Sequence, residues 1–433
     1  MILIYHMLTT FLLLLVLPVL PLVWLISAKR RANLLQRMGL FTGIPLKKPG
    51  EYRIWVHALS VGEVNSAVPF VTGLKKKRPK ENILFTASTR TGFETARRLM
   101  SPEKGGAPVS ALGYFPFDVW ICVLAVVFRA RPDLVCLVET DLWPGFLSIM
   151  KLRRIPVVLV NARLSPRSLT GYRRLGSFST LFFSGLSHVM AQTSKDADGF
   201  EELGISKDRI SITGNMKFDR PGRDITRSTR QMLEKKMGVR TGQKVWIAGS
   251  THQGEESVVV EAFDGIRKTC PGLKVIIAPR DPKRTRQLLR ELPIAPYAAA
   301  CFSDPEPERI KADILFIDVL GELALAYAVC DFAFIGGSLV EQGGHNPLEP
   351  AMFGKPLVFG PHMTDFREIE NLLMDAGGAA RVRNARELLH KGELILADTG
   401  LCESMGEAAQ KVFYENAGAL KKILKKLDGD FLV

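Results

Sequence analysis

Four charged side chains stand directly behind apolar segments that have the composition of buried strands. Glu63 follows "RIWVHAL" and lies behind the glycine of "SVGEV", at a predicted helix start. Glu139 and Asp141 follow "PDLVCLV", and Lys217 follows "ISITG". A charge at the end of a buried strand costs free energy unless it is paired or used. These four side chains are therefore the candidates for a chemical role in the first half of the chain.

Glu63 is predicted to lie in the first turn of a helix. The partial positive charge at a helix N-terminus stabilises a carboxylate, so we expect Glu63 to be ionised. An ionised carboxylate suits the role of a general base and not that of a general acid. The alternative is a purely structural role, because acidic residues are common in the first turn of helices.

The second half of the chain contains a glycine-rich stretch, "FAFIGGSLVEQGGHNPLEPAMFGKPLVFGP". A predicted strand runs into Gly336, Gly337 and Ser338, and a second glycine pair precedes "HNPLEP". Asn346 suits a helix N-cap, and Pro347 suits the first helical position. Glycines let a ligand approach the backbone closely, and free N–H groups at a helix start bind phosphate. The alternative is a tight, well-capped loop that binds no ligand.

Three further groups are predicted at the same edge as this loop. Arg280 follows Pro279 at the end of "KVIIAPR", where its guanidinium could bind a phosphate or a carboxylate through two donors. Another helix is predicted to start near Gly321-Glu322, behind "ILFIDVL". Glu349, in the first turn after Pro347, could accept hydrogen bonds from ribose hydroxyls. Each group has a structural alternative, but together they predict a nucleotide pocket that needs no metal.

No common nucleotide or metal signature accompanies these groups. The sequence contains no G-x-x-x-x-G-K-[ST], G-x-G-x-x-G, G-x-S-x-G or H-E-x-x-H pattern. The seven histidines form no metal-spaced pair, and the six cysteines contain no C-x-x-C. We therefore expect no metal and no cofactor. Cysteines scattered through apolar segments are typical of small core residues in a reducing compartment.

The elements that must position these residues alternate between apolar strand segments and helical patterns. One series runs from "RIWVHAL" to "ISITG", and a second runs from "KVWIAGST" to "PLVFGP". Strands that are apolar throughout are typical of parallel sheets covered by helices on both faces. The alternation therefore predicts two doubly wound α/β domains.

A charged segment with a Pro-Gly break, "DRPGRDITRSTRQMLEKK", separates the two series. We expect one domain over residues 31–218, a second over 219–402, and a helical segment over 403–433. Ligands of such sheets bind at the carboxyl ends of the strands, so we expect the site in the cleft between the two domains.

The N-terminus predicts a membrane anchor over residues 1–30. The chain carries no charge from Met7 to Ala28, which is long enough for a spanning helix of about 20 residues. The basic residues 29–31 and Arg37 follow it, so the positive-inside rule places the remaining chain on the cytoplasmic side. A monotopic insertion and a cleaved signal peptide are the alternatives, although a signal peptide has its basic residues before the apolar core.

The charge balance favours an anionic partner. The formal net charge is +14, and the segment Lys151–Arg174 contains seven Lys or Arg and no acidic residue. This segment is either a solvated face or a contact for anionic lipid head groups or a phosphorylated acceptor. Aromatic residues are not interleaved as a stacking platform requires, so we expect no nucleic-acid partner.

Seven motifs over nearly the whole chain give it a specific resemblance. It resembles the Kdo transferases of lipopolysaccharide synthesis, which move 3-deoxy-D-manno-octulosonic acid (Kdo) from CMP-Kdo to lipid A precursors. The motifs occur in the same order as in that family. They are "VHALSVGEV", "LVETDLWP", "LVNARLS", "GNMKFD", "AGSTHQGEE", "GGHNPLEP" and "FGKPLVFGPHM".

The resemblance implies a GT-B fold, in which two Rossmann-like domains face a cleft, and an inverting transfer without a metal. It implies an inner-membrane anchor, with the catalytic domains on the cytoplasmic side. It also implies that Glu63 is the general base and that Glu139 and Lys217 stabilise the transition state. With Gly337 and Ser338 from the glycine-rich loop, the implied CMP-binding residues are Pro279, Arg280, Leu320, Gly321, Glu322, Asn346, Pro347, Leu348 and Glu349.

The sequence departs from the family pattern at two positions. Leu320 stands where the family often has Met, so only a backbone contact with the nucleotide would be kept there. Asp141 stands where the family often has a second Glu, which leaves Glu139 unaffected. A CMP-sugar donor has a single phosphate as its leaving group, and helix N-termini with Arg280 can stabilise its charge without a divalent ion.

Two other functions fit the residues without the resemblance. One is a GT-B transferase that uses a nucleotide-diphosphate sugar. The other is a non-catalytic membrane protein that binds nucleotide or lipid through the same scaffold. A donor screen separates the first from a Kdo transferase, and an assay on a lipid A precursor separates the second.

Overall fold

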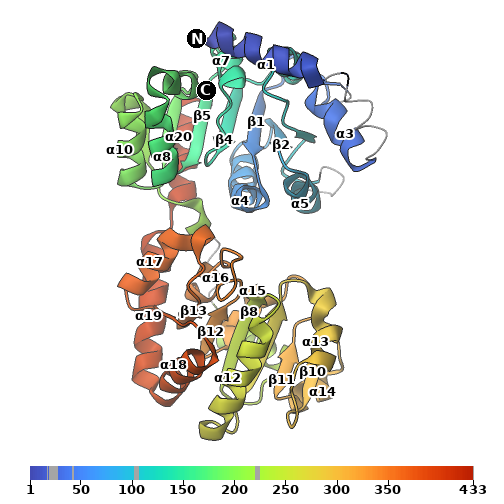
Figure 1. Ribbon diagram of the computed structural model, residues 1–433, viewed down its shortest axis with the longest axis vertical. Helices are drawn as coiled ribbons and strands as arrows, with labels where there is room; N and C mark the ends of the chain where they lie inside the picture. Colours follow the sequence, from blue (N-terminus) through green and yellow to red (C-terminus); the bar gives the residue numbers. More distant parts are fainter. Residues whose placement is uncertain (17, 19–27, 41–42, 102–106, 220–224, 433) are drawn as a thin grey trace. The chain divides into compact units, whose positions relative to one another are not determined.

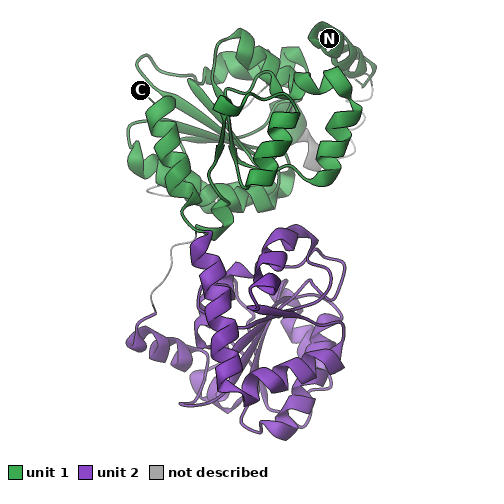
Figure 2. Ribbon diagram, turned by 90° about the vertical axis from the view of Figure 1, so that its left-hand side faces the viewer, with its two compact units in different colours: residues 1–220, 417–433 green, residues 221–416 purple. Residues whose placement is uncertain are grey.

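The computed structural model describes residues 1–433 except for 17, 19–27, 41–42, 102–106, 220–224 and 433. The chain forms two compact units, residues 1–220 with 417–433 and residues 221–416 (Figure 2). Each unit contains one seven-stranded parallel sheet with helices packed against it (Figure 1). The prediction of two doubly wound α/β domains is therefore confirmed.

The sheet of unit 1 has the strand order β3-β2-β1-β4-β5-β6-β7, and every neighbouring pair is parallel. The chain starts at β1, moves outward to β3, and then returns to the other side of β1 with β4. The order of the strands reverses between β1 and β4, and ligands of such sheets bind outside the carboxyl ends at this point. The strands are β1 (Arg53–Ala58), β2 (Asn82–Ala87), β3 (Ala111–Tyr114), β4 (Leu134–Val138), β5 (Val157–Ala162), β6 (His188–Ala191) and β7 (Ile210–Ile212).

Helices cover both faces of this sheet, which explains why its strands are apolar throughout. One face packs against α4 (Val61–Lys77), α5 (Arg90–Met100) and α20 (Ala419–Asp430), and Figure 1 shows α4 and α5 side by side. The other face packs against α6 (Trp120–Ala130), α7 (Pro144–Leu152), α9 (Thr180–Phe183) and α10 (Ser194–Glu202). The short helix α8 (Pro166–Arg174) has no buried residue.

The C-terminal helix α20 returns to unit 1 after the chain has completed unit 2. Ile423 and Leu427 are fully buried in the core that α4 also lines. Asp219 anchors the start of α20, because its carboxylate accepts the N–H groups of Gly418 and Leu420. Residues 403–433 were predicted as one helical segment, whereas the structure divides them between α19 (Thr399–Glu415) of unit 2 and α20 of unit 1.

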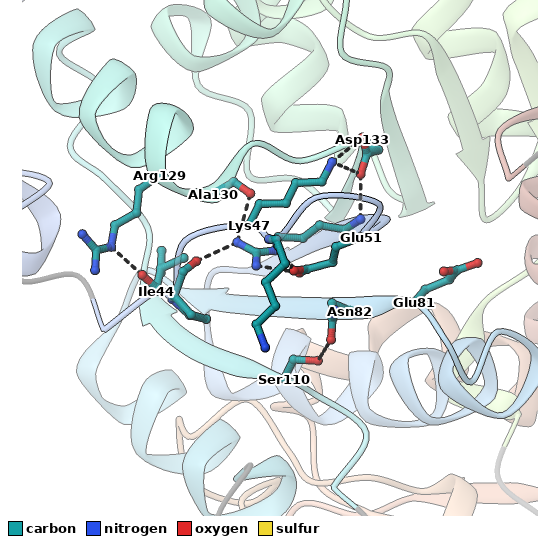
Figure 3. A network of polar contacts seen from close by, with 12 residues as sticks. Ile44, Lys47, Glu51, Glu81, Asn82, Ser110, Arg129, Ala130 and Asp133 are labelled. Atoms are coloured by element: carbon teal, nitrogen blue, oxygen red, sulfur yellow. Dashed lines mark hydrogen bonds and ion pairs between the residues drawn. The ribbon is translucent and has the colours of Figure 1, made fainter.

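A network of polar contacts lies at the amino ends of β1 and β4 (Figure 3). The Lys47 ammonium lies 2.6 Å from one oxygen of Asp133, and the other oxygen accepts the Arg53 backbone N–H at 2.7 Å. The Arg53 guanidinium donates to the carbonyl of Ala130, and Arg129 donates to the carbonyl of Ile44. These contacts hold the segments that precede β1 and β4 together at the amino edge of the sheet.

The helix α1 (Ile2–Val16) packs beside α7, and α3 (Ala28–Arg37) follows it. The Tyr5 hydroxyl donates to Asp118 at 2.6 Å, and a ring nitrogen of His6 lies 3.0 Å from the Ser148 hydroxyl. Of the helices in the described part of the chain, none combines the length and the apolar character that a bilayer crossing requires. Residues 17 and 19–27 of the predicted anchor lie outside the described residues.

The sheet of unit 2 has the order β10-β11-β9-β8-β12-β13-β14, again with parallel neighbours. Here the order reverses between β8 and β12. The strands are β8 (Val245–Thr251), β9 (Lys274–Pro279), β10 (Ala299–Cys301), β11 (Ile314–Phe316), β12 (Phe332–Ile335), β13 (Leu357–Phe359) and β14 (Ala379–Arg381).

The helices of unit 2 also lie on both faces of their sheet. One face packs against α12 (Glu255–Thr269), α13 (Thr285–Glu291) and α18 (Ala385–Ala397). The other packs against α11 (Arg227–Lys236), α15 (Leu323–Ala326) and the 3-10 turn Tyr327–Val329. The remaining helices are α14 (Glu306–Lys311), α16 (Leu348–Ala351), α17 (Arg367–Asp375) and α19.

A buried lysine joins β9 to two neighbouring segments. Lys274 is 0% exposed, and its ammonium donates to the carbonyls of Gly238, Arg309 and Ala312 at 3.0, 2.6 and 2.8 Å. Each of its three N–H groups therefore has an acceptor. This complete pairing explains how a charge is tolerated in the core.

Candidate active site

Glu63 lies at the carboxyl edge of the unit 1 sheet, where β1 passes into α4. Ser60 is the N-cap of α4, and its hydroxyl accepts the N–H of Glu63 at 3.4 Å. The Glu63 carboxylate turns back and accepts the N–H of Leu59 at 2.6 Å. These two reciprocal bonds resemble a capping box, which holds the carboxylate over the end of β1.

Burial raises the pKa of the Glu63 carboxyl. Only 7% of the residue is exposed, and this burial raises the pKa of its carboxyl to about 8. The Leu59 N–H opposes the rise, the charges of Glu139 and Asp141 add to it, and Lys217 opposes it. The expectation that the helix start keeps Glu63 ionised at neutral pH is therefore wrong, because desolvation outweighs the helix dipole. A carboxyl with a pKa near neutrality is suited to accepting a proton during a reaction.

Glu139 lies directly after β4, the strand beside β1. It is buried, and its backbone has a φ of 65°, a left-handed conformation that costs free energy in a residue with a side chain. The side-chain amide of Asn161, at the end of β5, lies 3.3 Å from an oxygen of Glu139. The amide oxygen of Asn161 accepts the N–H of Met216 at 2.9 Å. Asn161 thus links Glu139 to the turn that carries Lys217.

Lys217 belongs to the 3-10 turn Met216–Phe218 behind β7. Its charge lowers the pKa of Glu63, so the two side chains lie within electrostatic reach of each other. The structure therefore brings together the three predicted catalytic residues, Glu63, Glu139 and Lys217, which come from three different strand ends. Asn161 was not predicted, although a polar residue at the end of the apolar segment "PVVLV" is the signal that could have identified it.

Asp141 is paired with a histidine that was not predicted as part of the site. An oxygen of Asp141 lies 2.6 Å from Nε2 of His57 and accepts the Ser88 hydroxyl at 3.2 Å. Burial acts to raise the pKa of Asp141, but the hydrogen bond and the charge of His57 outweigh it and hold the pKa below its usual value. His57 is 0% exposed and stacks on Phe115. This pairing explains why a second acidic side chain is tolerated beside Glu139.

The carboxyl edge of the unit 2 sheet carries three basic side chains from different strand ends. Arg280 follows β9, its N–H donates to the Thr251 carbonyl at 2.9 Å, and the residue is exposed. His252 follows β8, and His345 lies in the loop after β12. The Nε2 atoms of the two histidines are 2.8 Å apart, and the charge of Arg280 acts on His345. Donors from three strands at the point where the strand order reverses are typical of an anion site.

The amides of Gly337 and Ser338, predicted to bind CMP, already have a partner. The N–H groups of Gly337, Ser338 and Leu339 donate to the carboxylate of Glu255 at 2.6, 3.0 and 2.9 Å. Glu255 is 0% exposed at the start of α12 and also accepts the His252 N–H. The Glu255 carboxylate therefore accepts the backbone N–H groups that were predicted to bind a phosphate. No local sequence pattern predicts this pairing across 82 residues.

The remaining predicted CMP-binding residues lie at the end of β9 or after β11 and β12. Pro279 and Leu348 are buried, and Leu320 is 70% exposed. Glu322 pairs with Lys236 at 2.6 Å, and the oxygen of the Asn346 side chain accepts the Leu348 N–H at 3.0 Å.

Gly321 has a φ of 95°, which suits a glycine. Glu349 is half-buried in the first turn of α16 and Pro347 precedes it. The helices α15 and α16 each have four residues, so their dipoles are weaker than the prediction assumed.

In the part of the chain that the structure describes, no group of three or more His, Cys, Asp or Glu side chains is arranged to hold a metal ion. Polar side chains at the carboxyl edges of the two sheets contact each other in pairs instead, as His57 with Asp141 and His252 with His345 show.

Comparison with known proteins identifies a family for this chain. A family model described as 3-Deoxy-D-manno-octulosonic-acid transferase (kdotransferase) matches residues 32–220. The 3-deoxy-D-manno-octulosonic acid transferase of Haemophilus influenzae is 32% identical over 407 residues, which are 93% of this chain and 92% of that protein. The Bordetella pertussis protein of the same name is 30% identical over 400 residues, 90% of each chain.

Solved structures are similar in fold. The UDP-GlcNAc 2-epimerase from Neisseria meningitidis, bound to UDP-GlcNAc, superposes with a TM-score of 0.58 at 14% sequence identity. The match covers 87% of this chain and 100% of the epimerase. Together with the two parallel sheets, this likeness supports the predicted GT-B fold.

Proposed function

Because this chain belongs to the Kdo transferase family, we propose that it is an inverting glycosyltransferase that moves Kdo from CMP-Kdo to a lipid A precursor. One observation carries the proposal at the level of residues. Glu63, with a pKa of about 8, shares the carboxyl edge of its sheet with Glu139 and Lys217. A family member with this cluster has the groups that a proton-coupled glycosyl transfer requires.

Glu63 acts as the general base in the proposed reaction. Its ionised carboxylate takes the proton of the acceptor hydroxyl, and the oxygen attacks the anomeric carbon of Kdo. The bond between that carbon and the phosphate oxygen breaks, and its electron pair stays on the phosphate of CMP. Attack from the face opposite the leaving group inverts the configuration.

Glu139 and Lys217 are proposed to stabilise charge as the bond breaks. The transition state of glycosyl transfer has positive charge on the sugar ring, which a carboxylate such as Glu139 stabilises. The Lys217 ammonium stabilises negative charge, either on the Kdo carboxylate or on the ionised Glu63. Asn161 supports both roles, because it contacts Glu139 and the backbone beside Lys217.

CMP is proposed to bind at the carboxyl edge of the unit 2 sheet. Arg280 is exposed there and is proposed to bind the phosphate, since a guanidinium can donate two parallel hydrogen bonds. The segments 320–322 and 346–349 are proposed to contact the nucleoside. Gly337 and Ser338 leave this set as amide donors, because Glu255 already accepts their N–H groups.

No metal takes part in the proposed reaction. The leaving group carries one phosphate, and fixed positive charge at its departure point lowers the barrier as a metal would. Arg280 supplies this positive charge at the carboxyl edge of the unit 2 sheet.

The cytoplasmic face of the inner membrane is the proposed location. Leu152 is 81% exposed on α7, and the neighbouring residues Lys151, Arg153 and Arg154 are also exposed. The apolar side chains Leu3, Met7 and Phe11 of α1 line an apolar groove of about 630 Å³ that Leu152 also lines. An apolar surface with a basic rim favours anionic lipid head groups. The full chain should float with vesicles of anionic phospholipid, and a protein left in solution would contradict this location.

Mass spectrometry of the reaction products tests the proposed activity. The purified full chain is incubated with CMP-Kdo and a tetraacylated lipid A precursor, and we expect one or more Kdo masses added to the acceptor. UDP-sugars in place of CMP-Kdo serve as the control and should give no product. Transfer from a UDP-sugar, or no transfer from CMP-Kdo, would contradict the proposal.

A further inference from the structure

Two histidines face each other where β8 and β12 lie side by side in unit 2. The Nε2 atoms of His252 and His345 are 2.8 Å apart, and the planes of their rings differ by 8°. Both residues are half-buried. A Cβ at Gly337 would lie 3.1 Å from Cδ2 of His345 and 3.4 Å from Cδ2 of His252, so the glycine leaves room for both rings.

The contact limits how many protons the two rings can hold. At 2.8 Å one Nε2 donates and the other accepts, because two N–H groups or two lone pairs would repel each other. The pair is then neutral, or it has one positive charge if the donating ring is also protonated at Nδ1. A second positive charge would place protons on both facing nitrogens and break the bond. The pair can therefore take up one proton while the contact lasts.

The surroundings of His345 oppose its protonation in the absence of an anion. Burial lowers the pKa of His345 to about 4, and the charges of Arg280 and His252 contribute to the lowering. The carboxylate of Glu255, on α12, is engaged with four backbone N–H groups. Three further carboxylates belong to this loop or its neighbours: the exposed Glu341 in the loop, Asp365 beside Gly343, and the half-buried Glu349 in α16. At neutral pH His345 is uncharged, and a negative charge beside it would favour protonation.

We propose that the His252–His345 pair takes up one proton from solvent when the bond to the sugar breaks and the doubly charged phosphate of CMP is formed beside it. The inference rests on the proposed function, which places the donor at this edge of unit 2. In CMP-Kdo the phosphate is a diester with one negative charge. When its bond to the sugar breaks, the electron pair stays on the phosphate oxygen, and CMP gains a second negative charge.

The proton on the histidine pair balances this second charge and stabilises the leaving group. It is distinct from the proton of the acceptor hydroxyl, which goes to Glu63. Both protons return to solvent when the products leave, so the protein is unchanged over one cycle. The same uptake should occur when CMP binds from solution, because its phosphate is mostly a dianion above its second pKa of about 6.

Calorimetry of CMP binding measures this uptake directly. The full chain is titrated with CMP at pH 7.5 in buffers that differ in their enthalpy of ionisation. The slope of the observed binding enthalpy against the buffer enthalpy gives the number of protons taken up, and we expect about one per CMP. Cytidine lacks the phosphate and should show no buffer dependence.

Two variants and one matched control separate the histidine pair from other groups. His345→Asn and His252→Asn should each bind CMP without proton uptake, because either substitution removes the shared site. His390, exposed on α18, provides the control His390→Asn, which should keep the wild-type uptake. CMP binding by the wild-type chain without uptake, or uptake that survives in both pair variants, would overturn the inference alone. A wild-type chain that binds no CMP would overturn the proposed donor site and the inference with it.

Discussion

The protonation of Glu63 should determine how the transfer rate depends on pH. A general base works only when it is ionised, and burial raises the pKa of this carboxyl to about 8. About one tenth of the molecules then have an ionised Glu63 at pH 7, and about nine tenths at pH 9. We therefore expect kcat/KM to rise about tenfold between pH 7 and pH 9 and to level off above that.

Two substitutions should move this rise in opposite directions. Glu139→Gln removes a charge that raises the pKa of Glu63, so the rise should begin at lower pH. Lys217→Met removes a charge that lowers the pKa, so the rise should begin at higher pH. Both variants should also be slower, because both residues are proposed to stabilise the transition state. The pH at which the rate rises can still be compared, because it does not depend on the maximal rate.

The assay follows product formation from CMP-Kdo and a lipid A precursor, with the acceptor well below its KM, between pH 6 and pH 9.5. The phosphate groups of the acceptor titrate near pH 6 and therefore do not account for a rise near pH 8. A profile that is flat from pH 6 to pH 9 would refute the assigned role of Glu63. Shifts of the same sign in the two variants would refute the electrostatic reasoning.

Three further predictions concern the base, the metal and the core. Glu63→Gln should lower kcat by at least about 100-fold while CMP binding by calorimetry is unchanged, and a variant with nearly wild-type turnover would exclude Glu63 as the base. Prolonged dialysis against EDTA should leave the rate of transfer unchanged, so a loss restored by a divalent ion would contradict the metal-independent reaction. Lys274→Met should lower the free energy of unfolding by about 3–5 kcal/mol in urea, because two buried carbonyls and one partly buried carbonyl lose their donor. The exposed Lys268→Met should change it by less than about 0.5 kcal/mol, and equal effects of the two would count against this account of Lys274.

The sequence alone was sufficient to place the candidate residues at the correct edges of the sheets. Apolar segments that alternate with helical patterns predict parallel sheets, and all strands of such a sheet end at the same edge. Glu63, Glu139 and Lys217 each follow a strand, so the topology alone brings them to one edge. The same reasoning places Arg280 and the glycine-rich loop at one edge of the second sheet. The quoted motifs then identified the family, which the relatives confirm.

The partners of these residues were decided by tertiary structure. His57 and Asp141 are 84 positions apart, and His252 and His345 are 93 apart, so no local pattern predicts that they touch. Glu255 occupies the amides that had been assigned to a phosphate, because the start of α12 packs under the loop after β12.

The protonation state of Glu63 was also decided by tertiary structure. The helix start at Ser60 can be recognised in the sequence, and it alone predicts an ionised Glu63. Packing removes water from the carboxyl and adds the charges of Glu139 and Asp141, which together raise its pKa to about 8. The amino-acid sequence determines which residue follows a given strand. Only the folded surroundings determine whether that residue carries a charge, because desolvation depends on every segment packed around it.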